Sequence, residues 1–265
     1  MNIFLHELKA YRKSTIIWLL SLIAIMMLFM SLFPSFHKDA EEFTKLLEGY
    51  PESLRKAIGL DLGNLFTIMG FYTYALTFII LIGAIQAMNL GTSIVSKEVR
   101  EKTADFLLTK PVTRTTVITA KLMAAFVSLV ITNVIYGVAT YGMASQVKTE
   151  DYSLKMFLLL SLSIFWIQLI FLAIGIVMSV MVRKIKSVLT VSLATVFSFY
   201  FIGMIGATTG DAKLRYLSPF KYFDPAEIMK HAGYDISYVI TGAVIIVIAV
   251  SASYFIYAHK DIHAV

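Results

Sequence analysis

The sequence contains no cysteine among its 265 residues. That absence excludes disulfide frameworks, thiolate metal sites and cysteine nucleophiles. Charge is also scarce, because Asp, Glu, Lys and Arg make up 15% of the chain against about 25% in soluble domains. Hydrophobic residues make up 58%, against a usual share of about 45–50%. A soluble fold of this length cannot bury so much apolar surface, so the composition predicts a polytopic membrane protein.

The apolar residues form six blocks of about 20 to 27 residues, and each block can cross a hydrocarbon core of about 30 Å as an α-helix. None of the six contains Asp, Glu, Lys, Arg or His. The short alternating segments of a membrane β-barrel are not visible. We therefore expect an all-α membrane protein, a single domain over residues 1–265 with six transmembrane helices. The predicted spans are 14–33, 70–95, 122–145, 156–182, 188–207 and 236–258.

Six spans place both termini on the same side of the membrane. In the segments on that side, Lys and Arg occur about once in four residues, against about once in seven on the other side. The positive-inside rule therefore predicts cytoplasmic N- and C-termini. It also accounts for most of the net charge of +6, so we expect no nucleic-acid partner.

The segment before the first span, Met1–Lys13, places Phe4, Leu8 and Tyr11 on one helical face. This spacing favours a short amphipathic helix lying at the interface of the inner leaflet. A frayed basic N-terminus is the alternative.

The sequence lacks the patterns that intramembrane catalysis requires. It has no His-Glu-x-x-His, no histidine in any span to serve as a base, and no carboxylate at membrane depth. His259 and His263 have a spacing that suits a metal, but they lie in a short tail that we expect to be solvated. Gly-x-x-x-x-Gly-Lys-[Ser/Thr] is also absent. We therefore predict that the chain is not an enzyme and has no cofactor, and that any ATP it uses is hydrolysed by another chain.

Four amides are the main polar side chains within the spans. They either line a conduit or form hydrogen bonds between helices. Carriers coupled to protons or sodium place ionisable residues inside the bundle, and this chain has none there, so another energy source is indicated. The amides, predicted as pathway lining, are Gln86, Asn89, Asn133 and Gln168.

The loop between the second and third spans has the pattern of a helical coupling element. Ser96 can cap a helix that ends near Pro111, and a second helix can start near Thr113 and run through Lys121 into the membrane. The first helix carries an apolar stripe at helical spacing. The stripe consists of Val99, Thr103, Phe106 and Leu107.

This loop resembles that of the type-2 ABC transporter permeases, in the branch of small six-span half-transporters. The segments Tyr50–Leu60, after the first span, and Leu217–Asp224, before the last, resemble the same family, although Lys102 stands where the family commonly has glycine. In the loop, the matching positions are Glu98, Thr103, Leu107, Leu108, Pro111, Val112, Thr113, Arg114 and Lys121.

The resemblance implies the permease half of an ABC exporter in the cell membrane, a dimer, and most simply a homodimer. It also implies docking to two cytosolic ABC ATPase subunits. An amphipathic peptide, drug or lipid-like substrate is our preference. The alternatives are a membrane scaffold or sensor that binds an ATPase without transport, and a secondary carrier that needs no ion. The expected ATPase-coupling residues are Glu98, Val99, Thr103, Phe106, Leu107, Pro111, Arg114 and Lys121.

The outer segment after the first span keeps helical phase from Phe43 to Ile58 across a break at Gly49–Pro51. We therefore expect two short helices that cap the bundle, either as a gate or as a packing lid. Pro219 and Pro225 are interpreted as loop punctuation before the last span.

Overall fold

The computed structural model describes residues 3–51, 54–55, 62–100, 112–148, 150–182 and 185–259, with the backbone alone for 98–100 and 212. Within these ranges the regular elements are helical, and six helices are long and apolar enough to cross a membrane. The prediction of an all-α, six-span protein is therefore confirmed. The elements are α1 (Ile3–Lys38), α2 (Ala40–Glu48), α4 (Ile68–Arg100), α6 (Arg114–Val147), α7 (Leu154–Met181), α8 (Val188–Thr209), α9 (Ala212–Leu217), the 3₁₀ helix η1 (Pro219–Lys221), α10 (Pro225–His231) and α11 (Ile236–His259).

Short hydroxyl side chains fix where three of the long helices begin. The hydroxyls of Thr113, Ser153 and Ser187 each accept a hydrogen bond from the backbone N–H three residues further on, at 3.2, 3.4 and 3.3 Å. Each satisfies one of the donors that a helix start leaves unpaired. The expected start of a helix near Thr113 is thus confirmed, and this helix continues without a break into the third span.

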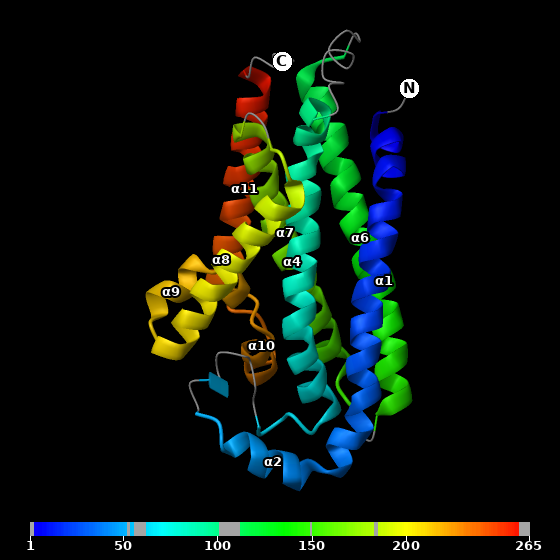
Figure 1. Cartoon of the computed structure of the whole chain (residues 1–265), viewed down its shortest axis with the longest axis vertical. Coiled ribbons are helices and arrows are strands. Elements are labelled where there is room, and N and C mark those ends of the chain that lie inside the picture. Colours follow the sequence, from blue (N-terminus) through cyan, green and yellow to red (C-terminus); the bar gives the residue numbers. More distant parts are fainter. Residues whose placement is uncertain are drawn as a thin grey trace.

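Helices α4 and α7 form the centre of the bundle. They pack against each other most extensively, with α1 and α6 on one side and α8 and α11 on the other (Figure 1). α1 begins and α11 ends at the same end of the bundle, which we call the terminal end; the opposite end is the distal end (Figure 1).

Two glycines allow the central pair to touch through their backbones. A Cβ added to Gly91 of α4 would lie 2.4 Å from the Leu172 carbonyl oxygen of α7. A Cβ added to Gly175 of α7 would lie 2.7 Å from the Met88 carbonyl oxygen of α4. Small residues at such crossings permit the close van der Waals packing that holds membrane helices together.

The interfacial helix expected at Met1–Lys13 is instead the first part of α1, which runs unbroken from Ile3 to Lys38. The amphipathic face has the predicted phase, but it packs on protein. Tyr11 is buried, and so is Glu7 on the same face. The prediction of a separate helix on the leaflet was wrong because an ion pair from Glu7 holds this segment against α6.

The coupling loop also begins differently from the prediction. α4 continues through Ser96 to Arg100, and the Ser96 hydroxyl donates to the Thr92 carbonyl oxygen at 2.6 Å instead of capping a new helix. The expected cap was wrong because the helical hydrogen bonds of the span simply continue. Residues 101–111 lie outside the described residues.

At the distal end, α2 lies across the bundle after α1 (Figure 1). Phe43 of α2 stacks on Phe36 of α1, with ring centroids 4.3 Å apart. This confirms the first of the two expected short helices; most of the second lies outside the described residues. Pro219 and Pro225 open the short helices η1 and α10, because a proline fits the first helical turn.

Candidate coupling and pathway sites

A buried ion pair joins three helices at the terminal end. Lys121 of α6 is 1% exposed, and its Nζ lies 3.0 Å from Glu7 Oε1 of α1. The same Nζ donates to the Ile94 carbonyl oxygen of α4 at 2.9 Å. Lys121, which the family resemblance assigned to coupling, therefore lies inside the bundle, and any part that it plays in coupling acts through α1 and α4.

A second set of contacts fixes the start of α6 against the end of α11. Arg114 Nη1 donates to the Ala258 carbonyl oxygen at 3.3 Å. One turn further on, the hydroxyls of Thr119 and Tyr254 lie 2.8 Å apart. Arg114 is thus placed at the terminal end, where the expected coupling loop re-enters the bundle.

The remaining expected coupling residues cannot be placed in the same way. The backbone of Glu98 and Val99 lies in the last turn of α4. Thr103, Phe106, Leu107 and Pro111 lie outside the described residues. Their assignment to coupling stays a prediction.

Three of the four predicted pathway amides meet in the middle of the bundle. Gln168 of α7 is fully buried; its Nε2 donates to Gln86 Oε1 of α4 at 3.2 Å, and its Oε1 accepts from Asn133 Nδ2 of α6 at 2.5 Å. Gln86 Nε2 in turn donates to the Thr132 hydroxyl of α6 at 3.3 Å. The amides therefore form hydrogen bonds between α4, α6 and α7. Asn89, the fourth, is half-buried one turn closer to the terminal end.

An open groove of about 600 Å³ runs between α6 and α7 beside this network. Its lining is almost entirely apolar, with Asn133 and Ser161 among the polar contributors. Asn133 therefore takes part in the amide network and also lines the groove.

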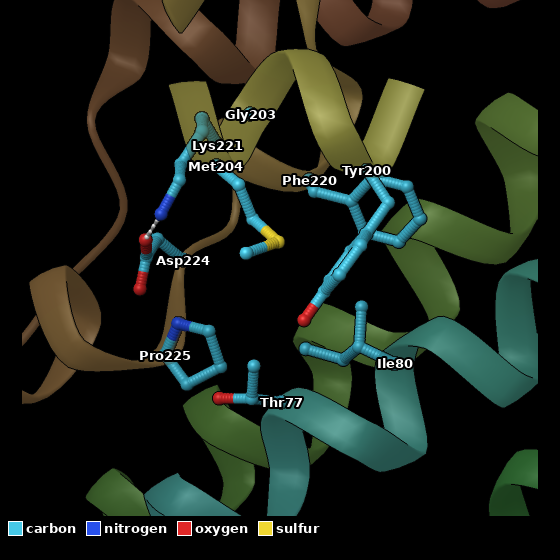
Figure 2. A pocket seen from close by; sticks show the side chains of 9 residues that line it. All are labelled: Thr77, Ile80, Tyr200, Gly203, Met204, Phe220, Lys221, Asp224 and Pro225. Atoms are coloured by element: carbon cyan, nitrogen blue, oxygen red, sulfur yellow. Dashed lines mark hydrogen bonds and ion pairs between the residues drawn. The ribbon is translucent and has the colours of Figure 1, made fainter. Parts of the chain in front are cut away.

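The structure also brings charged residues against the second span, which the sequence analysis did not foresee. Lys221 Nζ of η1 and Asp224 Oδ2, just before α10, lie 2.6 Å apart with side chains 20% and 18% exposed. They border a small pocket, shown in Figure 2, beside Thr77 of α4. Thr77 lies about 14 Å along α4 from its distal start at Ile68. The i, i+3 spacing of Lys221 and Asp224 indicates in the sequence that the two charges can pair. Their position beside Thr77 could not be predicted, because α4 lies far from them in the sequence.

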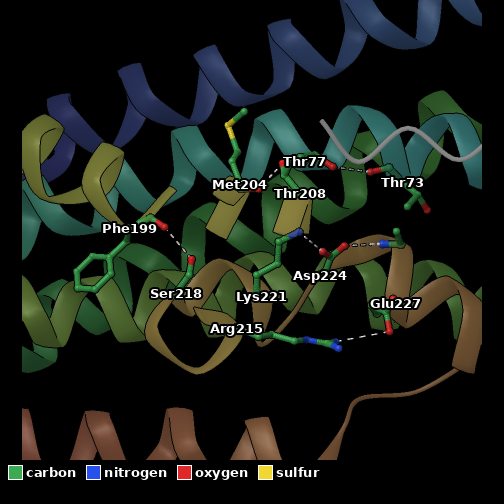
Figure 3. Close-up of polar contacts among 11 residues, drawn as sticks. Thr73, Thr77, Phe199, Met204, Thr208, Arg215, Ser218, Lys221, Asp224 and Glu227 are labelled. Carbon is green, nitrogen blue, oxygen red and sulfur yellow. Dashed lines mark hydrogen bonds and ion pairs between the residues drawn. The ribbon is translucent and has the colours of Figure 1, made fainter. Parts of the chain in front are cut away.

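Neighbouring polar contacts hold the segment between α8 and α11 in place; we call residues 211–235 the distal segment (Figure 3). The Ser218 hydroxyl donates to the Phe199 carbonyl oxygen of α8 at 2.8 Å, and Arg215 Nη2 lies 3.5 Å from Glu227 Oε2. The pocket has about 40 Å³ of free space, enough for a very few waters and too little for a peptide or drug. The ion pair therefore lies in a tightly packed part of the distal half, with little free space around it.

Burial also affects two tyrosines of the distal segment. The Tyr234 hydroxyl donates to the Leu159 carbonyl oxygen of α7 at 2.6 Å, and burial raises the pKa of Tyr234 above its ordinary range. The Tyr222 hydroxyl donates to the Tyr216 carbonyl oxygen, and burial raises the pKa of Tyr222 as well. Both hydroxyls therefore stay protonated and act as hydrogen-bond donors. The Tyr222 hydroxyl joins two parts of the distal segment, and the Tyr234 hydroxyl joins this segment to α7.

Of the two C-terminal histidines, the structure describes one. His259 Nδ1 lies 2.9 Å from the Phe255 carbonyl oxygen, whereas His263 lies outside the described residues. Across the part of the chain that the structure describes, no three potential His, Asp or Glu ligands gather at one point.

Over the described residues, six helices are long and apolar enough to cross a membrane, and α1 begins at the end of the bundle where α11 finishes, which is the arrangement of a polytopic membrane protein. The family model of the ABC-2 family transporter proteins matches residues 1–262. The chain therefore belongs to this family and is a permease component of an ABC transporter, a multi-pass protein of the cell membrane that is not itself catalytic. The resemblance to type-2 ABC permeases is confirmed. No curated protein and no solved structure matches the chain significantly.

Proposed function

We propose that this permease exports an amphipathic peptide, drug or lipid-like substrate at the expense of ATP hydrolysed by a separate cytosolic ABC ATPase. The terminal end faces the cytoplasm in this proposal, and residues 1–265 act as one six-span domain. The basic character of the segments at the terminal end supports the orientation. The lack of a phosphate-binding loop in the sequence supports a separate ATPase.

The observation that carries the proposal is the anchoring of the 96–121 loop. Its first root, the end of α4, and its second root, the start of α6, are joined by Lys121 inside the bundle. Arg114 additionally connects the second root to the end of α11. A force applied to the loop by a cytosolic partner would therefore reach α4, α6 and α11 directly.

Within the loop we assign different roles to the apolar and charged residues. Val99, Phe106 and Leu107 would insert into a groove on the ATPase, because apolar anchors in a pocket typically contribute about 2 kcal/mol or more each. Glu98 and Arg114 would hold the loop in shape. Exposed ion pairs contribute only about 0.2–1 kcal/mol, so losing either charge should affect coupling more than assembly. Thr103, Pro111 and Lys121 complete the coupling set.

A dimer completes the proposed transporter. Six helices with short connections form half of a pathway, so we expect two identical permeases with two ATPase subunits. The α6–α7 groove and the amides Asn133 and Gln168 suit the lining of a route for a molecule that is largely apolar with a few polar groups.

The experiment compares three loop variants with the parent, each co-expressed with the ATPase. Phe106→Ala should lower co-purification of the ATPase. Glu98→Ala and Arg114→Ala should co-purify normally and transport poorly in proteoliposomes supplied with ATP and a panel of fluorescent amphipathic peptides and drugs. Lys148→Ala, an exposed change at the distal end, is the matched control. Normal co-purification and transport by all three loop variants would contradict the proposal.

A further inference from the structure

The N-terminal part of α1 contacts both roots of the 96–121 loop. Glu7, whose side chain is 10% exposed, pairs with Lys121 of the α6 root at 3.0 Å. One turn further along α1, Tyr11 is 7% exposed, and the Lys97 ammonium of the α4 root lies 5.9 Å from the centroid of its ring. An ammonium within about 6 Å of an aromatic face is attracted by it. Two independent contacts therefore place α1 against the loop.

The Glu7–Lys121 pair is costly to separate. Both groups are removed from water, and the Lys121 ammonium also donates to the Ile94 carbonyl oxygen at 2.9 Å. A buried charge that loses its counter-charge pays a large desolvation penalty. We call the three connected residues Glu7, Lys121 and Ile94 the Glu7 clasp. We expect the clasp to make the first turns of α1, the end of α4 and the start of α6 move together.

α1 can carry a movement of this clasp across the whole bundle. It is one helix of 36 residues, about 54 Å long at 1.5 Å per residue. At the distal end it leads directly into α2, which begins at Ala40. A displacement of the loop roots would therefore reach the distal end along α1, in addition to any movement of the central helices.

We propose that Glu7 is a positioning residue for energy coupling: through Lys121, which also contacts the end of α4, it fixes α1 to both roots of the loop, so that the first helix moves with the ATPase-driven loop. This inference rests on the proposed function. It adds α1 to α4, α6 and α11 as helices that move when the ATPase displaces the loop. Because Glu7 is buried against Lys121, the proposed role is to position these helices, and not to contact the ATPase or the substrate.

The first test measures the clasp in the permease alone. Because the chain has no cysteine, spin labels can be placed at Ala10→Cys on α1 and Thr115→Cys at the α6 root, both exposed. With Glu7 present, the inter-label distance distribution should be narrow; Glu7→Gln should broaden or shift it. Asp151→Asn, which breaks the exposed Lys148–Asp151 pair at the distal end, should leave it unchanged. An unchanged distribution in Glu7→Gln would overturn the proposal.

The second test measures coupling in proteoliposomes that contain the permease and its ATPase. Glu7→Gln should co-purify with the ATPase and hydrolyse ATP within about twofold of the parent, while transport per ATP hydrolysed falls roughly 2- to 30-fold. Asp151→Asn should keep the parental ratio. A merely structural role would lower assembly, hydrolysis and transport together, and that result, like a parental ratio, would overturn the proposal.

A further variant covers the case in which Glu7→Gln does not fold. Glu7→Leu combined with Lys121→Met replaces the ion pair by apolar side chains, a change that buried pairs often tolerate. It should fold and show the same loss of transport per ATP; a parental ratio would again overturn the proposal. If the parental complex shows no ATP-dependent transport, the proposed function fails, whereas the spin-label result still decides whether Glu7 holds α1 to the loop.

Discussion

Gly91 and Gly175 set how closely α4 and α7 approach, and their replacement by alanine tests the packing of the bundle. The new Cβ atoms would lie 2.4 Å and 2.7 Å from carbonyl oxygens of the facing helix. Contacts of this kind ordinarily begin near 3.4 Å. Gly91→Ala therefore requires the two helices to separate by about 1 Å, because the clashing atoms are backbone in a close-packed interior and cannot rotate away.

This separation affects the most extensively packed helix pair in the bundle. Overpacking of a well-packed interior typically costs about 1–3 kcal/mol, and we expect each substitution to fall in that range. Gly137→Ala in α6 is the matched control, since nothing lies within 4 Å of its added Cβ. It should be neutral or stabilise the protein by up to about 1 kcal/mol, because alanine favours a helix over glycine. Thermal unfolding in detergent measures all three. Midpoints of Gly91→Ala and Gly175→Ala equal to that of Gly137→Ala would refute the packing described.

Three further predictions concern the amides, the orientation and the distal segment. Gln168→Leu removes the hydrogen bonds that Gln168 makes with the buried Gln86 and the half-buried Asn133, and it should lower stability by about 1–3 kcal/mol in the same unfolding assay; an unchanged midpoint would show that these bonds do not stabilise the protein. With the termini in the cytoplasm, an impermeant thiol reagent applied to whole cells should label Glu150→Cys and not Thr115→Cys, and the reverse pattern would overturn the orientation. The raised pKa of Tyr234 means that the folded state holds this proton more tightly than the unfolded state, whose pKa is near 10.0. Stability should be full below pH 10 and fall above it more steeply for the parent than for Tyr234→Phe, whereas parallel pH curves would contradict the burial of this hydroxyl.

The six-span fold could be predicted from sequence because hydropathy and helix length are local properties. Uninterrupted apolar blocks leave an α-helix as the only structure that satisfies its own backbone in lipid. The helix ends were harder to place, since charged residues continue a helix beyond the hydrocarbon core. α1 is the clearest case: the sequence gives no hint that its first turns join the span, or that they pack on α6 instead of lipid.

The sites show the same division between local and non-local information. The residue types at the amide positions were visible in the sequence, and both interpretations of them, pathway lining and interhelical hydrogen bonds, followed from chemistry alone. The structure supplies the hydrogen bonds of Gln86, Asn133 and Gln168, while their role in the pathway stays a prediction. The Glu7–Lys121 pair joins residues 114 positions apart. Hydrophobic periodicity in the sequence does not indicate that α1 lies beside α6, so this pair could be found only in the folded chain.

Reconstitution with and without the ATPase tests the central claim most directly. The purified permease is placed in proteoliposomes alone, with its ATPase, and with its ATPase blocked by vanadate, and uptake of a fluorescent amphipathic substrate is followed on adding ATP. The account predicts ATP-dependent transport only for the unblocked pair, and neither ATP binding nor hydrolysis by the permease alone. Transport by the permease without its ATPase, or an ATPase complex that hydrolyses ATP and moves none of the substrates tested, would contradict it.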